Sequence, residues 1–364
     1  MPSSISSSER RRPSLLWQPV LGGAALAALL FVCLMELRLG LRGIRPTVPD
    51  TEARWIEQRS SAAALGERAL ILVGSSRMQV DADLGVLRAR TGLEPVQLAV
   101  DGSSFMPVLE GLAADEAVRG TVIVDLLDPH LTSHNQQETA YRWQQAYERS
   151  RARRELPDFE RVERWLSDAW RQRLRSYAND TRPLTSLRHR LLTATQQYFV
   201  TLSDRSQLVD YSKVEMPAFY YRRALKHLGI SAPPLAPGWT WGDLDQLLRG
   251  RIEQLTPRTD AIEAYAAAVR TVAAQAQAIR ARGGRVYFVA LPASGLVRLM
   301  DERRMPRALF WDRLAREIGT PTLHFEDVPA LREFSCPDGS HLDIRQRAAF
   351  THALVDALGL GTAR

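Results

Sequence analysis

The sequence predicts an α/β protein with three α/β/α layers and a mainly parallel, five-stranded sheet, preceded by one transmembrane helix and carrying a helical insertion. Three observations lead to this prediction. Short runs that are apolar on both faces alternate with helix-like stretches, an arginine- and aromatic-rich segment interrupts the alternation, and a long uncharged run lies near the amino terminus. Strands that alternate with helices form βαβ units, whose covered parallel sheet is apolar on both faces.

The candidate strands are short and are separated by helix-like stretches with recognisable ends. Gly92 follows one such stretch and two glycines, at 283 and 284, close another, as glycine commonly does where a helix ends. The expected strands are residues 69–73, 96–100, 121–127, 285–295 and 320–328. The expected helices are residues 81–91, 107–118, 259–284, 305–317 and 344–360.

Residues 135–240 are predicted to form the insertion. The segment is rich in arginine and aromatic residues, has a mainly helical pattern and contains no strand-like run. Its aromatic side chains between residues 143 and 177 are interpreted as packing residues. The alternative is a platform for saccharides, because aromatic faces stack on sugar rings.

The amino-terminal segment is predicted to be an uncleaved signal anchor. Three arginines precede an uncharged run from Pro13 to Met35, and roughly 20 apolar residues are enough to cross a bilayer. The arginines favour a cytoplasmic amino terminus, with the main domain on the periplasmic side of a bacterial inner membrane. The expected division is a cytoplasmic tail (1–13), a transmembrane anchor (14–36), a juxtamembrane linker (37–65), an α/β domain (66–134 and 241–364) and the insertion (135–240).

Composition narrows the function classes. The chain has 364 residues, 45% of them hydrophobic and 24% charged, which is typical of a protein with a substantial core. The net charge is +7, but no nucleic-acid-binding module accompanies it, so no nucleic acid is expected as a partner. The two cysteines, Cys33 and Cys336, form no CxxC pair. Asp128, His130 and His134 fit no established ligand spacing, and neither a metal nor another cofactor is expected.

Two polar turns follow candidate strands, and a third polar loop precedes the last helix. Residues 74–76 read Gly-Ser-Ser, residues 101–103 read Asp-Gly-Ser, and Asp338 stands three residues before His341. In open α/β folds, ligands bind at the carboxyl ends of the strands. A serine hydroxyl needs an adjacent base to act as a nucleophile, and an aspartate can orient the histidine that serves as that base. Backbone N–H groups at Ser76 and Gly102 could then stabilise an oxyanion.

These motifs, in this order, resemble those of the SGNH/GDSL hydrolase superfamily. The resemblance is strongest to its membrane-anchored branch, which is associated with acylation of bacterial envelope polysaccharides, and it covers residues 66–130 and 283–360. It implies an SGNH/flavodoxin-like fold. It also implies that Ser76 is the nucleophile, Gly102 an oxyanion donor, His341 the base and Asp338 its orienting acid.

The sequence departs from the family pattern after the third strand, where "DLLDPHL" replaces a Gly-x-Asn-Asp motif. Ser75 stands where the first motif usually has an acidic residue, as the anchored branch often shows. Asn135 or Arg77 could supply the missing oxyanion contact, and Ser75 and Arg77 are further candidates for substrate binding.

The predicted function is acyl-ester hydrolysis or O-acyl transfer, most simply of acetyl groups, on an envelope glycan. By resemblance, a multi-spanning membrane acyltransferase is a candidate partner. One alternative is an envelope esterase or lipase with broad acyl specificity. The other is a catalytically inactive glycan-binding or scaffold protein in a polysaccharide assembly or export complex, which the missing asparagine would favour.

Overall fold

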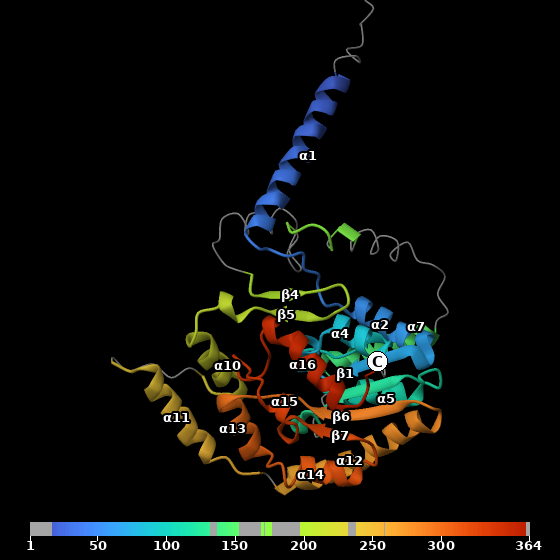
Figure 1. Ribbon diagram of the computed structural model, residues 1–364, viewed down its shortest axis with the longest axis vertical. Coiled ribbons are helices and arrows are strands. Elements are labelled where there is room, and N and C mark those ends of the chain that lie inside the picture. The colour runs from blue at the N-terminus through green and yellow to red at the C-terminus, as the bar shows by residue number, and fades with distance from the viewer. Residues whose placement is uncertain are drawn as a thin grey trace, which may run out of the picture.

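The computed structural model describes residues 17–131, 137–152, 169–170, 172–176, 197–231, 238–257 and 259–361. Its centre is a five-stranded sheet in which all strands are parallel, in the order β2-β1-β3-β6-β7 (Figure 1). The strands are β1 (Ala69–Val73), β2 (Glu94–Gln97), β3 (Thr121–Asp125), β6 (Arg285–Ala290) and β7 (Thr322–His324). The predicted α/β/α fold is therefore confirmed.

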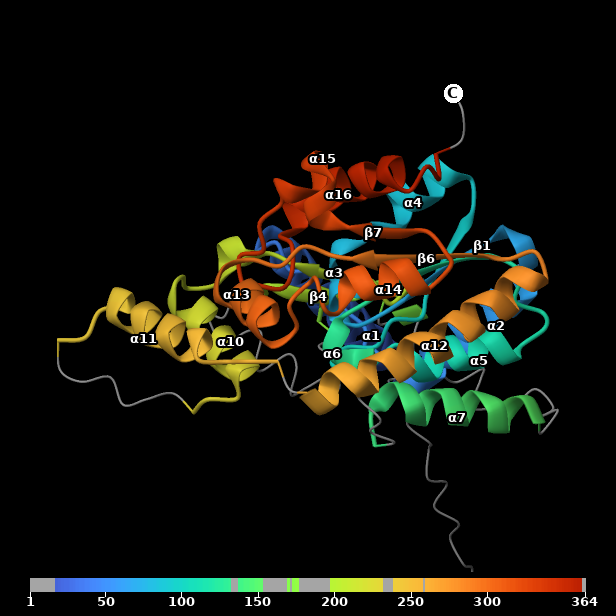
Figure 2. The same cartoon turned by 90° about the horizontal axis from the view of Figure 1, so that it is seen from below.

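Helices cover both faces of the sheet (Figure 2). One face packs against α2 (Glu52–Leu65), α5 (Met106–Ala114), α12 (Thr259–Ala281) and α14 (Trp311–Glu317). The other packs against α3 (Ser76–Asp81), α4 (Leu84–Thr91), α15 (Pro329–Arg332) and α16 (Ile344–Ala357). Strands β1 and β3 are buried along their whole length, which is why they lack polar alternation. The remaining short elements are η1 (Gly66–Arg68), α6 (Asp128–Leu131) and η3 (Phe325–Asp327).

The first strand has the predicted bounds, whereas the other four strands differ from the prediction. The second strand begins at Glu94, two residues before the predicted start, and ends at Gln97. The chain beyond it still donates hydrogen bonds from Leu98 to the carbonyl of Leu72 and from Val100 to that of Gly74, while it bends into the following turn. The third strand ends at Asp125, which places this carboxyl directly at the sheet edge. Strand β6 ends at Ala290, five residues before the predicted end, and β7 covers only Thr322–His324 of the predicted 320–328.

The predicted linker contains a helix of the folded domain. Helix α2 packs against β1, β2 and α7 (Thr139–Ala152). Trp55 is fully buried, and its indole N–H donates to the carbonyl oxygen of Leu98 at 2.9 Å. Arg59 is also fully buried and pairs with Asp115 at 3.1 Å. The sequence is compatible with a linker or a short helix here, and the structure has a helix whose buried face includes an arginine.

The insertion contains strands as well as helices, so the prediction of a segment without strands was wrong. Its described elements are α7 (Thr139–Ala152), the antiparallel hairpin β4 (Phe199–Thr201) and β5 (Gln207–Val209), η2 (Tyr211–Lys213) and α10 (Ala218–Leu228). The strands have three residues each, too few to produce a recognisable alternation. Trp143 and Tyr147 pack onto the core beside α2, whereas Trp165 and Tyr177 lie outside the described residues.

Helix α11 (Trp241–Glu253) groups with the insertion more closely than with the sheet. Its buried residues form one cluster with those of α10 and α13 (Gly295–Arg304). The predicted domain boundary at residue 241 thus falls immediately before a helix that packs on the insertion side of the molecule.

Helix α1 (Trp17–Leu41) projects away from the α/β domain (Figure 1). Its most apolar part has a mean hydropathy of 2.3, and the helix is long enough to cross a membrane. Only Met35 and Leu39 are buried, against the folded part of the chain. The helix extends to Leu41, beyond the predicted end at residue 36, and residues 14–16 lie outside the described ranges.

Candidate active site

Ser76 lies at the carboxyl end of β1 and is the first residue of α3. The turn that presents it requires glycine at position 74, because a Cβ there would lie 2.7 Å from the Cβ of Asp125. Gly74 has a φ of +153°. The side chain of Ser75 is buried, whereas Ser76 is partly exposed at the sheet edge. Of the two serines, only Ser76 is therefore presented toward solvent.

His341 links Ser76 to Asp338. Its Nδ1 lies 2.8 Å from Asp338 Oδ2, and its Nε2 lies 2.9 Å from Ser76 Oγ. An ionised carboxylate only accepts hydrogen bonds, so the proton is assigned to Nδ1. Nε2 then accepts a hydrogen bond from the Ser76 hydroxyl. The structure thus brings together the three side chains that the sequence predicts to act together.

A tight turn holds the Asp338 carboxylate in place. Oδ1 accepts hydrogen bonds from the backbone N–H groups of Ser340 at 2.9 Å and His341 at 2.8 Å. Gly339 has a φ of +89°, and a Cβ there would lie 2.5 Å from a methyl carbon of Val297. Burial raises the pKa of Asp338, but hydrogen bonds and charge interactions with His341 and the other donors outweigh burial and leave it below its usual value. Asp338 is therefore ionised at neutral pH.

The candidate oxyanion residues have different surroundings. Gly102 lies in the exposed turn after β2, has a φ of +64° and leaves open space where a side chain would be. Because β2 neighbours β1, this turn and Ser76 share one edge of the sheet. Asn135 lies outside the described residues.

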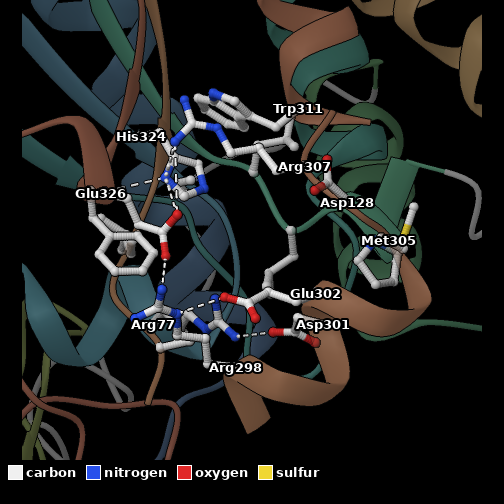
Figure 3. A pocket seen from close by; sticks show the side chains of 17 residues that line it. Arg77, Asp128, Arg298, Asp301, Glu302, Met305, Arg307, Trp311, His324 and Glu326 are labelled. Carbon is white, nitrogen blue, oxygen red and sulfur yellow. Dashed lines mark hydrogen bonds and ion pairs between the residues drawn. The ribbon is translucent and has the colours of Figure 1, made fainter. Parts of the chain in front are cut away.

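Arg77 is buried, and its guanidinium contacts two neighbouring elements. Its Nε donates to Ser340 Oγ at 3.2 Å, and its Nη2 contacts Asp301 Oδ2 at 3.4 Å. The side chain is buried and lines a cavity of about 90 Å³ at the ends of β3, β6 and β7 (Figure 3). Arg77 therefore connects α3 to the histidine loop and to α13, a role that its sequence position did not reveal.

The other arginines of this cavity are also ion-paired. Arg298 pairs with Glu302 and Glu326, and Arg307 pairs with Asp312 and Asp327. Figure 3 marks the pairs of Arg298 with Glu302 and Glu326 by dashed lines. Asp312 and Asp327, the partners of Arg307, are not among the residues that line the cavity.

Asp128, one of the residues considered as a metal ligand, accepts a hydrogen bond from the Tyr265 hydroxyl at 2.6 Å. Burial raises the pKa of Asp128 to about 7. Within the described ranges, no three His, Cys, Asp or Glu side chains are grouped so that they could hold a metal ion. His134 lies outside those ranges.

Two further carboxyl groups lie beneath the site. Asp81, at the end of α3, accepts a hydrogen bond at Oδ1 from the backbone N–H of Leu342 at 2.9 Å. Burial raises its pKa well above the usual value. Burial also raises the pKa of Asp125 to about 6, partly offset by the charge of Arg77. Asp125 follows an apolar strand-like run, so its burial could be expected, whereas the burial of Asp81 at the end of α3 could not.

The insertion contributes residues to the site that sequence reasoning did not identify. Arg223 on α10 places its Nε 3.3 Å from Asp338 Oδ2. The backbone N–H of Tyr211 donates to Asp343 at 2.9 Å, beside the histidine loop. Burial raises the pKa of the Tyr211 phenol, and the negative charge of Asp338 nearby raises it further. These contacts connect positions more than a hundred residues apart, and no local sequence pattern predicts them.

Arg205 stabilises the turn that carries Gly102. It is fully buried and donates to the carbonyl oxygens of Gln97 at 2.6 Å and Ala99 at 3.0 Å. The same guanidinium pairs with Asp50, with Nε 2.6 Å from Oδ1. Arg205 has a φ of +67°, which is uncommon outside glycine and fits the tight connection between β4 and β5. The hairpin thus holds the start of the loop that contains the candidate oxyanion donor.

No family model matches the sequence, and no curated protein matches it either. The geometry of the side chains is therefore the basis on which a function can be assigned.

Proposed function

We propose that the protein is a membrane-anchored, SGNH-like serine acyl-esterase or O-acyltransferase that acts on envelope glycans through an acyl-enzyme. The observation that carries this proposal is the continuous hydrogen-bond chain from Ser76 through His341 to Asp338. Such a chain gives a weak nucleophile an adjacent base and gives that base a fixed orientation.

The proposed reaction has two stages. Ser76 Oγ attacks the ester carbonyl while its proton passes to His341 Nε2, and the protonated His341 then donates this proton to the departing alcohol. The acyl group remains on Ser76. In the second stage, water or a glycan hydroxyl transfers its proton to His341 Nε2 as its oxygen attacks the acyl carbon. The bond between this carbon and Ser76 Oγ then breaks, and His341 returns the proton to Ser76 Oγ. Asp338 stabilises the charged histidine and is not itself protonated.

The negative charge of each tetrahedral intermediate requires hydrogen-bond donors. We assign this role to the backbone N–H groups of Ser76 and Gly102. Ser76 begins α3, where backbone N–H groups lack partners within the helix. Gly102 lies in the neighbouring exposed turn, where the absence of a side chain leaves room for substrate. Both donors belong to the backbone, so the proposed chemistry does not require the asparagine that the third motif lacks.

We further propose that α1 spans the bacterial inner membrane, with the α/β domain in the periplasm. The length and apolar character of α1 support membrane insertion, and the arginines that precede it in the sequence support a cytoplasmic amino terminus. Resemblance alone suggests a multi-spanning acyltransferase as the donor of the acyl group.

Activity-based labelling tests the nucleophile directly. The full-length protein in detergent is treated with a fluorophosphonate, which reacts with activated serines, alongside the variants Ser76→Ala and His341→Ala. Labelling is expected for the wild type and is expected to be lost in both variants. Ser60→Ala is a matched control, because Ser60 is an exposed serine on α2, and it should label like the wild type.

Absence of labelling in the folded wild-type protein would contradict the proposed activity and favour the inactive scaffold. If labelling depends on Ser76, the products formed from an activated acetyl ester distinguish the two enzyme classes. Acetylated glycan indicates transfer, whereas free acetate alone, even at high glycan concentration, indicates a hydrolytic esterase.

A further inference from the structure

The insertion places a positive charge beside the acid member of the triad. Arg223 Nε lies 3.3 Å from Asp338 Oδ2, the same oxygen that interacts with His341 Nδ1. Asp338 is 1% exposed, whereas the Arg223 side chain is about one-third exposed. A charge interaction at the wall of a largely buried site is stronger than one on an open surface, because solvent screens it less.

The packing of α10 explains why Arg223 reaches this position. The buried side chains Tyr221, Ala224 and Leu225 form one cluster with α11 and α13. The neighbouring Tyr220 hydroxyl accepts a hydrogen bond from the backbone N–H of Leu296 at 2.7 Å. Helix α10 is therefore fixed to the start of α13.

The segment before α13 is in turn bonded to the turn that carries Asp338. The backbone N–H of Ser294 donates to the carbonyl oxygen of Gly339 at 2.9 Å. Helix α10 and the turn that carries Asp338 are therefore both hydrogen-bonded to residues at the start of α13. This common attachment fixes the position of Arg223 relative to the carboxylate.

Several other ionisable groups surround the Asp338–His341 pair. Arg77 is directed to Ser340 and Asp301, and burial followed by the charge of Arg223 lowers the pKa of His227 to about 4. His227 is therefore neutral at neutral pH. The groups that interact electrostatically with the pair or lie immediately around it are Arg77, Asp81, Tyr211, Arg223, His227 and Cys336. Arg223 is the cation among them that ion-pairs with Asp338 within the described part of the chain.

We propose that Arg223 is a positioning residue that offsets the negative charge of Asp338 and so opposes the charging of His341. This role rests on the proposed function of the triad. Asp338 alone would favour the charged form of His341, in which Nε2 carries a proton and cannot accept the one from Ser76. The nearby positive charge of Arg223 counteracts this effect, so the insertion extends the activity of the site toward lower pH.

The test is the pH profile of fluorophosphonate labelling for the full-length protein in detergent, between pH 5 and 9. For Arg223→Gln, the acid limb is expected to move to higher pH by about half to one unit, for two charges separated by several ångströms at the wall of a site. At pH 6 this corresponds to a rate about three- to tenfold lower, with little change at pH 8.5. Arg223→Lys keeps the charge and is expected to restore the wild-type limb.

Two control variants lie on the same helix. Arg222→Gln removes the adjacent arginine, whose guanidinium carbon lies 6.0 Å from the centre of the Phe219 ring. His227→Gln removes the other ionisable side chain of α10 close to the pair. Both are expected to keep the wild-type acid limb, because neither removes a charge that is present beside Asp338 at neutral pH.

Three results would contradict the proposed role of Arg223, and they can be distinguished from one another. An unchanged pH profile in Arg223→Gln, with normal wild-type labelling, would overturn the role of Arg223 and leave the triad intact. A uniform loss at every pH that lysine does not restore would indicate mere structural support and would also overturn it. With an acetyl-ester substrate, an increase in KM at constant kcat would show that Arg223 contacts substrate instead.

Histidine NMR provides a readout that does not depend on Ser76 chemistry. In protein labelled at the histidine ring carbons, the His341 signal is assigned by its absence in His341→Ala. Its titration midpoint is expected to rise in Arg223→Gln and not in Arg222→Gln. A shift of this midpoint without any serine labelling would support the charge coupling while contradicting the proposed activity. An unchanged midpoint would overturn the coupling itself.

Discussion

The pKa values of two buried aspartates of the site, Asp338 and Asp125, are shifted in opposite directions. Each is 1% exposed, so burial alone would raise the pKa of both. Asp338 interacts with His341, two backbone N–H groups and Arg223, and its pKa is lowered. The backbone N–H groups near Asp125 approach it without forming normal hydrogen bonds, and its pKa rises to about 6. The hydrogen-bond donors around each carboxyl group, more than its depth of burial, thus decide the direction in which its pKa shifts.

The largest expected effect is that of removing the charge at Asp338. In Asp338→Asn, the side chain cannot both accept from Nδ1–H and stabilise a charged His341, and the amide favours the wrong tautomer. We expect the rate of fluorophosphonate labelling to fall by about 10³- to 10⁴-fold. Circular dichroism should show an unchanged fold. Labelling within tenfold of the wild type would mean that His341 does not depend on this carboxylate.

Asp125→Asn tests the second of the two aspartates, whose pKa is raised. The pKa of Asp125 in the folded protein is about 6, above the value of about 3.9 expected when unfolded. Its contribution to stability is therefore fully present below about pH 4 and is lost as the pH rises through about 6, by up to about 3 kcal/mol.

The neutral isostere removes this pH dependence. We expect Asp125→Asn to have an unfolding free energy up to about 3 kcal/mol higher than the wild type at pH 7.5, and a smaller difference at pH 4.5. Urea unfolding followed by tryptophan fluorescence measures both values. A variant that is less stable than the wild type at pH 7.5 would show that Asp125 is stabilised in its charged form.

A smaller effect is expected from altering the turn that brings Asp125 close to Ser76. Gly74→Ala would place a methyl group 2.7 Å from the Cβ of Asp125, whereas the same change at Gly102 meets no atom within 4 Å. Gly102→Ala is the matched control, since both glycines follow strands and have positive φ. Its cost is the left-handed backbone, about 1–2 kcal/mol.

Gly74→Ala is expected to cost about 1–3 kcal/mol more than Gly102→Ala in unfolding free energy, because crowding is added to the backbone effect. It should also slow labelling by displacing Ser76. Equal destabilisation of the two variants would argue against close packing of Asp125 beneath the turn.

The parts of the molecule that were predictable from the sequence are those determined by local pattern. Buried parallel strands are apolar throughout, so β1, β3 and β6 could be located, and the carboxyl ends of neighbouring strands meet at one edge. That reasoning placed Ser76 at the sheet edge. The juxtaposition of Ser76 with Asp338 and His341 required the resemblance to a known family as well.

The supporting contacts were not predictable, because they depend on side chains that meet across long stretches of sequence. In the sequence, Arg223 resembles a solvated arginine on a surface helix. Only the packing of α10 on α13 places it beside Asp338. Arg205 lies in a hairpin whose strands are too short to recognise. Arg77 is a candidate for substrate contact from its sequence, and its contacts with Ser340 and Asp301 involve residues more than 200 positions away.

The short connection between α1 and the hairpin β4–β5 has a geometric consequence for a protein that is anchored by α1. Residues 42 to 47 separate the end of α1 at Leu41 from Val48, which is hydrogen-bonded to Thr201 of the hairpin. Six residues span at most roughly 20 Å. With α1 in a bilayer, as proposed, this connection keeps Val48 and the hairpin to which it is bonded within roughly 20 Å of the end of α1. The domain would therefore stay next to the membrane surface, and an acceptor would have to be reached there.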